Sequence, residues 1–328
     1  MWKVNAVQKL VAGSLLATGM VYSGIAAAEA YPNKPVRIVV AFPPGQTTDT
    51  IARTVAQQMS ISTGQQFIVE NKPGAAGIIG TTYVMNAKPD GYTLLFSSSG
   101  PMAINPALYK NITYDPVKNF TPVGMAVTVP IFLTVNPEVP ANSLQEFIAL
   151  VKDSPGKYSY GSGGTGITAH LAMETLKSAT GIDIMHVPYN GSPAAMTDLI
   201  GGRVQAMFDS GPSMSPHYKA GRIKVLGVTT KDRVSAEPSI PTIAEQGVEN
   251  FEAVTWAALF APAGTPKEIV DTLNAEINKA IRSSALVGPL SVAGAEPTPS
   301  TPEELAAFLE SEIVKWGQAV RDAGIQLD

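Results

Sequence analysis

The stretch VTVPIFLTVNP (residues 127–137) decides the fold, because it is long, apolar and rich in residues that favour β-strands. A second stretch of the same kind, FEAVTWAALFAP (residues 251–262), follows much later. A complete set of strand and helix patterns, residues 142–247, separates the two. If this middle part forms its own sheet, the two ends of the chain must close another lobe together. The pattern predicts two α/β lobes joined by two crossing strands with a hinge cleft.

The expected lobes are residues 31–128 plus 253–328 for lobe 1, and residues 129–252 for lobe 2. Two consecutive domains with a boundary near Pro137 are the alternative. Within lobe 1, β-type runs alternate with helical patterns, which is typical of parallel sheets. We expect strands at residues 36–41, 66–70 and 93–97, and helices at 50–59 and 77–85.

Three later helix starts carry a capping box, in which a hydroxyl residue is followed three positions on by Glu. The pairs are Ser143 with Glu146, Thr265 with Glu268, and Thr301 with Glu304. In the last two, Pro266 and Pro302 fall at the expected first helical position.

The first thirty residues have the pattern of a signal peptide, with Lys3 and Lys9 before an uncharged stretch that ends in small residues. Cleavage after Ala28 or after Ala30 fits, and the chain has no cysteine for lipid attachment. We therefore expect a protein exported to the periplasm. An uncleaved membrane anchor is the alternative, although glycine, serine and threonine interrupt the apolar stretch.

The charge of the chain excludes several classes of partner. Removing residues 1–30 changes the formal net charge from −4 to −5, and no basic stripe is present. Nucleic acids and anionic membrane surfaces are therefore poor partners. The absence of cysteine also excludes disulfides and thiolate chemistry.

The segment FPPGQTTDT (residues 42–50) lies where the first strand gives way to a helix. In open α/β sheets, ligands bind at such carboxyl ends of strands. We expect Thr47, Thr48 or Asp49 to cap this helix, while its unpaired backbone N–H groups attract an anion. The segment then holds a carboxylate through amides and hydroxyls, without a basic side chain.

The middle segment repeats this arrangement at GSGGTG (residues 161–166) and HVPYNGSP (residues 186–193), and SSSG (97–100) and DSG (209–211) also follow strands. Each lobe then presents helix N-termini to one cleft, and a small anion with a polar group at each end fits between them. Ordinary turn chemistry explains Ser, Asp and Gly at such places equally well. The predicted ligand-binding residues are Phe42, Gly45, Gln46, Thr47, Thr48, Asp49, Ser97, Ser98, Gly164, Thr165, Gly166, Thr168, Tyr189, Asn190 and Asp209.

Enzyme motifs fit less well. Residues 161–166 match the dinucleotide fingerprint, but no acidic residue ends the next strand, and there is no nucleotide P-loop. There is no G-x-S-x-G motif, and the three histidines lack the spacing of metal ligands. We expect no catalysis, cofactor or metal. The rival hypothesis is an exported hydrolase that uses Ser98, His170 and Asp209.

Short motifs are dispersed over the whole chain after residue 30: YPxKPVR from Tyr31, FPPG from Phe42, VENKPGA from Val69, KPDGYTL from Lys88, NPxLY from Asn105, HVPY from His186 and PxIPT from Pro238. With these motifs the chain resembles the Bug-type solute receptors, the extracytoplasmic receptors of tripartite tricarboxylate transporters. The resemblance implies a periplasmic-binding-protein-like fold whose first strand-to-helix loop, here Gly45 to Asp49, holds the ligand carboxylate. It also implies selectivity at the distal end of the ligand, near Thr165, Gly166, Thr168 and Asn190. Members usually have a second glycine where this chain has Gln46, whose bulk narrows the pocket.

Together these observations predict a periplasmic receptor, expected to be monomeric, that captures a small dicarboxylate or aromatic carboxylate by lobe closure. Delivery to a membrane permease follows from the resemblance. Phe42 is placed to cover an aromatic ring. An acidic amino acid is also compatible, since Asp49 or Asp209 can meet an ammonium group. A ligand sensor for a signalling partner uses the same physics.

Overall fold

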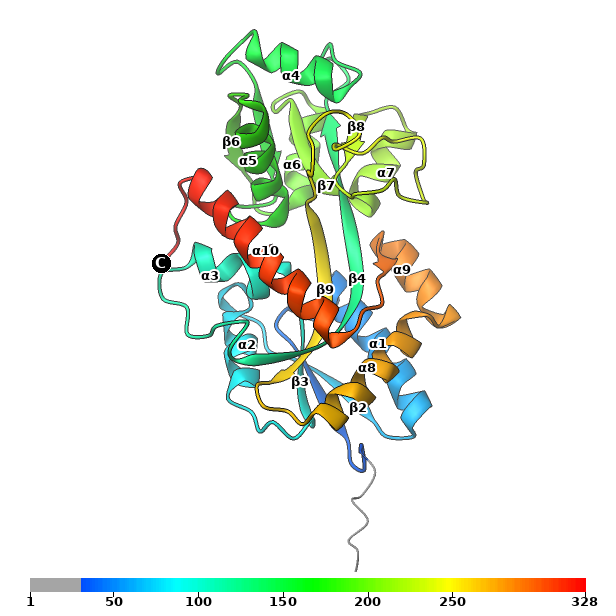
Figure 1. Cartoon of the computed structure of the whole chain (residues 1–328). Coiled ribbons are helices and arrows are strands. Elements are labelled where there is room, and N and C mark those ends of the chain that lie inside the picture. Colours follow the sequence, from blue (N-terminus) through cyan, green and yellow to red (C-terminus); the bar gives the residue numbers. More distant parts are fainter. Residues whose placement is uncertain (1–30) are drawn as a thin grey trace, which may run out of the picture.

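The computed structural model describes residues 31–328, except for the side chains of residues 289, 292 and 293. The predicted signal peptide, with both cleavage sites, lies outside the described residues. Figure 1 shows two lobes, one above the other, with strands β4 (Phe120–Val135) and β9 (Val254–Pro262) running between them. None of the helices within residues 31–328 combines the length and apolarity needed to span a bilayer.

The two crossing strands form an antiparallel ladder that extends from the pair Phe120 and Pro262 to the pair Pro130 and Val254. Beyond Pro130, β4 leaves β9 and pairs with β7 (Ala206–Ser210) and β8 (Lys224–Val228) of the upper lobe. Most residues of β4 are buried, because the strand is covered in both lobes. This burial on both faces explains its unbroken apolar sequence. The predicted crossing strands are confirmed.

Each lobe contains a parallel set of strands beside the crossing pair. In the lower lobe, which corresponds to the predicted lobe 1, the strand order is β2-β1-β3 next to β9. In the upper lobe, which corresponds to the predicted lobe 2, the order is β7-β5-β6 next to β4. The predicted strands and helices of lobe 1 are present within a few residues of the expected bounds. The remaining strands are β1 (Val36–Val40), β2 (Phe67–Asn71), β3 (Thr93–Ser98), β5 (Ser159–Ser162), β6 (Met185–Pro188) and β10 (Glu296–Pro297).

Helices cover the strands and connect them. Those of the lower lobe are α1 (Thr47–Thr63), α2 (Ile78–Met85), α3 (Asn105–Leu108), α8 (Lys267–Ile281) and α9 (Val287–Ala293), with the short turns η1 (Ala75–Gly77), η2 (Gly100–Ile104) and η3 (Ser284–Leu286). Those of the upper lobe are α4 (Leu144–Lys152), α5 (Thr168–Thr180), α6 (Ser192–Ile200) and α7 (Gly211–Lys219). The last helix, α10 (Pro302–Asp322), runs along both lobes (Figure 1).

One predicted capping box forms completely, one forms in part and one is wrong. Thr301 and Glu304 exchange both expected bonds at the start of α10. Ser143 caps α4, but the carboxylate of Glu146 bonds the N–H of Asn142 instead of that of Ser143. Thr265 does not cap α8, because its hydroxyl donates to the carbonyl of Pro262 and closes the turn after β9.

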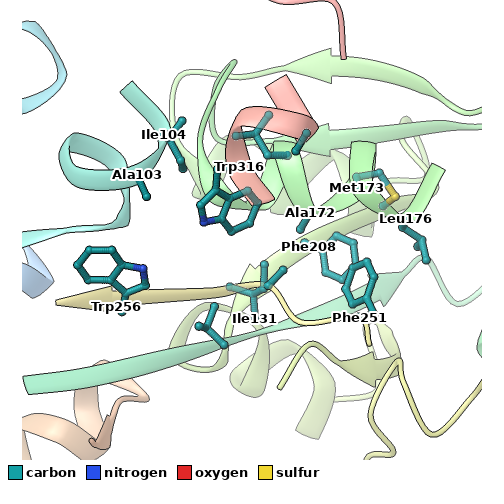
Figure 2. Packing of buried hydrophobic residues seen from close by; sticks show 14 of the residues in the cluster. Ala103, Ile104, Ile131, Ala172, Met173, Leu176, Phe208, Phe251, Trp256 and Trp316 are labelled. Atoms are coloured by element: carbon teal, nitrogen blue, oxygen red, sulfur yellow. The ribbon is translucent and has the colours of Figure 1, made fainter. Parts of the chain in front are cut away.

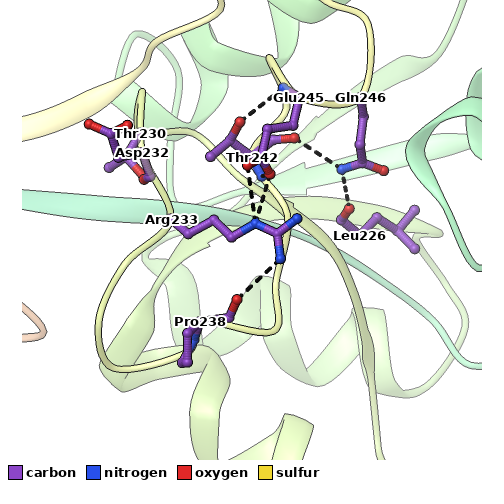
Figure 3. Close-up of polar contacts among 8 residues, drawn as sticks. All are labelled: Leu226, Thr230, Asp232, Arg233, Pro238, Thr242, Glu245 and Gln246. Carbon is purple, nitrogen blue, oxygen red and sulfur yellow. Dashed lines mark hydrogen bonds and ion pairs between the residues drawn. The ribbon is translucent and has the colours of Figure 1, made fainter.

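The segment 229–253, which returns from β8 to β9, is a succession of turns. Figure 3 shows how side chains order it: the guanidinium of Arg233 binds the carboxylate of Glu245 at 2.9 Å and the carbonyl of Pro238 at 3.3 Å. Glu245 also accepts the N–H of Thr242, whose hydroxyl accepts the N–H of Glu245. These bonds give a long connection the defined shape that it needs to lead into a crossing strand.

Thr229, at the start of this segment, ties the two crossing strands together. It is fully buried, and its hydroxyl lies 3.0 Å from the carbonyl of Ile131 in β4 and 2.5 Å from that of Ala253, just before β9. Its N–H also donates to Ile131 O at 3.0 Å. The point where β4 and β9 separate is therefore held by one side chain.

Helix α10 is anchored to the crossing strands by a buried carboxylate. Glu312 is 2% exposed and accepts hydrogen bonds of 2.8 Å from the indole N–H groups of Trp256 in β9 and of Trp316. Figure 2 shows both tryptophans in one apolar cluster with Ile104 and Phe208, which belong to different lobes. Because α10 also packs against α5 of the upper lobe, residues 302–322 contact both lobes. The domain boundaries stay a prediction.

We expect Glu312→Ala to lower the free energy of unfolding by roughly 2–4 kcal/mol, since it leaves two buried indole N–H groups without an acceptor. Urea denaturation would measure the loss. Glu310→Ala, at an exposed position of the same helix, is the matched control and should change stability by less than about 0.5 kcal/mol. Equal losses in the two variants would contradict the anchoring role.

Candidate functional site

A cavity of about 400 Å³ lies between the two lobes, and a smaller one of about 220 Å³ adjoins it through Ser210 and Thr255. The larger cavity is lined from the lower lobe by residues after β1 and β3, and from the upper lobe by the starts of α5 and α6 and the end of β7. Its volume is in the usual range for a site that encloses a small organic ligand.

Four helices begin at these cavities. Thr47 and Thr48 of α1 line the smaller one, while Thr168 of α5 and Ser192 of α6 line the larger one. Helix α7 begins directly after Ser210, which lines both. The first N–H groups of a helix have no partner within it, and they carry a partial positive charge. The walls therefore offer donors to an anion from both lobes.

Hydroxyl groups supplement these backbone donors. Ser98 and Ser99, at the end of β3, line the larger cavity together with Thr165 and Thr168 of the upper lobe. The hydroxyls of Ser99 and Thr168 lie 3.4 Å apart, so the two lobes meet directly at this point. Within the described chain, none of the residues that line the two cavities is lysine, arginine or histidine.

Another part of the larger cavity is apolar. Pro101, Ile104 and Leu108, from η2 and α3, line it together with Ile131 of β4. Leu108 also meets the upper lobe closely, since a Cβ atom added to Gly166 would lie 2.4 Å from its Cδ2. A side chain at position 166 would therefore require Leu108 to move, and the positive φ of 79° also favours glycine there. The apolar part of the cavity wall suits the carbon skeleton of a ligand.

The loop before α1 is built around Asp49, which is 2% exposed. Its carboxylate accepts the N–H of Gly45 at 2.8 Å, Nε of Arg53 at 3.0 Å and Nδ2 of Asn71 at 2.8 Å. Burial by itself raises the pKa of Asp49, but these hydrogen bonds outweigh burial and hold the pKa below its usual value. The expectation that Thr47, Thr48 or Asp49 caps α1 is wrong: Gln46 occupies the N-cap without a side-chain bond, because Asp49 is bound to the loop.

Asp209, at the end of β7, lines the larger cavity and is 5% exposed. One oxygen accepts the N–H of Ser210 at 2.8 Å, and the other accepts the hydroxyl of Ser213 at 2.5 Å. Burial raises the pKa of Asp209, and these hydrogen bonds only partly offset it. The carboxyl group orders the start of α7 and faces the ligand space at the same time.

The predicted site residues fall into two groups. Eight line the cavities: Phe42, Ser98, Thr165, Gly166, Thr168 and Asp209 the larger one, and Thr47 and Thr48 the smaller one. Seven line neither, namely Gly45, Gln46, Asp49, Ser97, Gly164, Tyr189 and Asn190. Direct contact with a ligand stays a prediction for all fifteen.

Hydrogen bonds, burial or exposure explain why several of these seven residues do not line a cavity. The amide of Gly45 is used by Asp49, and the hydroxyl of Tyr189 donates to Asp198 at 2.9 Å. Ser97 is fully buried beside β9. Gln46 is exposed, and its bulk does not line either cavity. Sequence reasoning missed the apolar surface of Pro101, Ile104 and Leu108, for which the NPxLY motif was the only signal.

His170 and His186 pack against each other, with their ring centroids 3.8 Å apart. Nδ1 of His170 accepts the N–H of Gly166 at 2.9 Å, so this nitrogen is not available as a base for Ser98. The described residues contain no group of three or more side chains arranged to hold a metal ion. The geometry thus gives no support to the hydrolase alternative.

Comparison with known proteins shows that this chain is similar to receptors and periplasmic proteins of transporters. The chain matches the family described as tripartite tricarboxylate transporter family receptor over residues 51–325. It is 38% identical to protein BugT of Bordetella pertussis over 97% of both chains. A solved periplasmic transporter is 40% identical, with a TM-score of 0.74, over 91% of this chain and 100% of that one.

Two further relatives were solved with a ligand. R. palustris Rpa4515 with adipate is 37% identical, with a TM-score of 0.74, over 90% of this chain and 99% of that one. MatC from Rhodopseudomonas palustris with bound malate is 32% identical, with a TM-score of 0.70, over 88% of this chain and 100% of that one.

We expect Asp49→Asn to lower the free energy of unfolding by roughly 1.5–3 kcal/mol near neutral pH, because an amide offers one acceptor to three donors. The folded pKa of Asp49 is lowered, so its stabilisation is present above the unfolded value and is lost as pH falls through the folded pKa. The difference between the wild type and the variant should shrink toward about pH 3 in denaturation curves. Asp183→Asn, at an exposed position, is the control; a difference that stays constant with pH would contradict this role.

We expect Gln46→Gly to change the dissociation constant of a bound carboxylate by less than about threefold, since Gln46 lines neither cavity and makes no side-chain bond at the N-cap. Thr48→Ala removes a hydroxyl that lines the smaller cavity and should weaken binding roughly tenfold. Isothermal titration calorimetry would measure both. A larger effect for Gln46 than for Thr48 would mean that the glutamine amide reaches the ligand.

Proposed function

This chain belongs to the tripartite tricarboxylate transporter receptor family, and we propose that it captures a small organic carboxylate between its two lobes and delivers it to the permease of such a transporter. Members of this family are periplasmic solute-binding receptors rather than enzymes. The remaining questions are the class of ligand and how this chain holds it.

The observation that carries the proposal is the polar wall of the two cavities. It consists of helix N-termini and hydroxyl groups from both lobes, and none of the described lining residues is a cationic side chain. Such donors stabilise a carboxylate through backbone N–H groups and the helix dipole. Asp209 adds one carboxyl group to the same wall, which favours a ligand with a donor, such as a hydroxyl or ammonium group, at that point.

The apolar surface narrows the ligand class. A carbon chain or ring can pack on the apolar side chains of Pro101, Ile104 and Leu108. The aromatic residue Phe42 lines the same cavity. Adipate and malate, the compounds with which two relatives were solved, are both dicarboxylates. We therefore propose a dicarboxylate or an aromatic carboxylate.

Lobe closure is the proposed recognition step. A ligand in the larger cavity contacts Ser98 and Ser99 of one lobe and Thr165 and Thr168 of the other only while the lobes are together. Because the ligand binds the closed arrangement more tightly than an open one, it shifts the population of receptors toward the closed arrangement. The permease then distinguishes loaded from empty receptor by the relative position of the lobes.

We expect a fitting carboxylate to stabilise the protein by about 2.7 kcal/mol at 100 times its dissociation constant. The melting temperature of residues 31–328 would be measured with aliphatic mono-, di- and tricarboxylates, aromatic carboxylates and acidic amino acids. Adipate compared with its uncharged diamide provides a matched control for the role of the carboxylates. A response confined to one carboxylate class supports the proposal, and a response to neutral solutes alone contradicts it.

A further inference from the structure

A stacked pair of histidines lies beside the ligand cleft, although it lines neither cavity. His170 comes from α5 and His186 from β6, and their rings are 3.8 Å apart with an interplanar angle of 11°. Tyr160 of β5 extends the stack, with its ring centroid 4.8 Å from that of His186. Three neighbouring elements of the upper lobe therefore meet in one aromatic column.

Each imidazole holds one end of the glycine loop, which we define as residues 162–166. At one end, Nδ1 of His170 accepts the N–H of Gly166 at 2.9 Å. At the other end, Nε2 of His186 lies 2.7 Å from the hydroxyl of Ser162. That hydroxyl also lies 2.9 Å from the carbonyl of Gly164, so Ser162 links the ring of His186 to the backbone of the loop.

The glycine loop forms part of the ligand cavity and has little room to move. Thr165 and Gly166 line the larger cavity. A Cβ atom on Gly163 would lie 2.8 Å from the backbone nitrogen of Ser192, and one on Gly166 would lie 2.4 Å from Leu108. The loop therefore fits between the start of α6 and the opposite lobe, and a small shift in it would alter the contacts that close the cleft.

The hydrogen bond from Gly166 requires a neutral His170, because only an unprotonated Nδ1 can accept it. Burial lowers the pKa of His170 to about 3, and the nearby His186 and Lys177 add to this effect. Burial also lowers the pKa of His186, against the opposing influence of Glu174. Glu174 itself binds Lys177 at 2.8 Å and the hydroxyl of Tyr160 at 2.5 Å, so its charge is compensated. Each ring therefore offers the glycine loop one bonded nitrogen, and burial favours the uncharged form of both rings.

We propose that His170 and His186 are positioning residues that fix the glycine loop in the conformation that binds the ligand. The proposal rests on the ligand site proposed above and adds two residues that act through the loop rather than by contact. The two rings use different nitrogens, because His170 bonds the loop through Nδ1 and His186 bonds it through Nε2.

Crossed amide substitutions test this assignment. The amide of Asn places polar atoms near the position of Nδ1, and the longer Gln places them near that of Nε2. We expect His170→Asn and His186→Gln to keep the dissociation constant within about threefold of the wild type. His170→Gln and His186→Asn should weaken binding roughly tenfold, the usual consequence of one lost hydrogen bond. The probe is the carboxylate with the largest effect on the melting temperature.

Hydrogen exchange of the glycine-loop amides is the readout that needs no ligand. Exchange should rise about tenfold in His170→Gln and stay near the wild-type rate in His170→Asn. A pure packing role would make Asn and Gln equivalent at each position, and that result overturns the proposal. If no carboxylate binds the wild type, the proposed function fails while exchange still tests the histidine pair. If His170→Gln does not fold, as its melting curve would show, the two variants of His186 carry the same comparison.

Discussion

The antiparallel pairing of β4 with β9 is the constraint on which the rest of the molecule depends. These strands are the covalent and hydrogen-bonded connection between the lobes, and β4 changes partners at Pro130. Both strands are largely buried, and β4 is covered in both lobes, so pulling β4 away from its partners would expose apolar surface. Thr229 joins the two strands at the point where they separate.

Buried carboxylates that accept several hydrogen bonds recur at the starts of two helices beside the cleft and at the contact between α10 and β9. Asp49 shapes the loop before α1, Asp209 orders the start of α7, and Glu312 anchors α10 to β9. A buried charge without partners would be very unfavourable, so each of these residues fixes the groups around it. In this way the protein orients neutral donors toward the cavities while the described residues that line them include no cationic side chain.

Sequence reasoning succeeded where a signal is local and repeated along the chain. Alternating strand and helix patterns located β1 to β3 within a few residues, and two long apolar stretches identified the crossing strands. It succeeded less well where one group has competing partners. Thr265 has the sequence pattern of a helix cap, but its hydroxyl donates to the carbonyl of Pro262 instead. The N–H of Gly45 was expected to bind the ligand, but in the fold it donates to the carboxylate of Asp49.

The sequence by itself determined the two-lobed α/β architecture, the family and the set of loops that meet at the cleft, because periodicity and motifs are properties of the chain order. Only the tertiary structure decided which side chains of those loops face the ligand space, since that depends on bonds between residues far apart in sequence. The apolar surface of Pro101, Ile104 and Leu108 and the stack of His170 on His186 are examples. Both are created by elements that meet only when the sheets and helices pack.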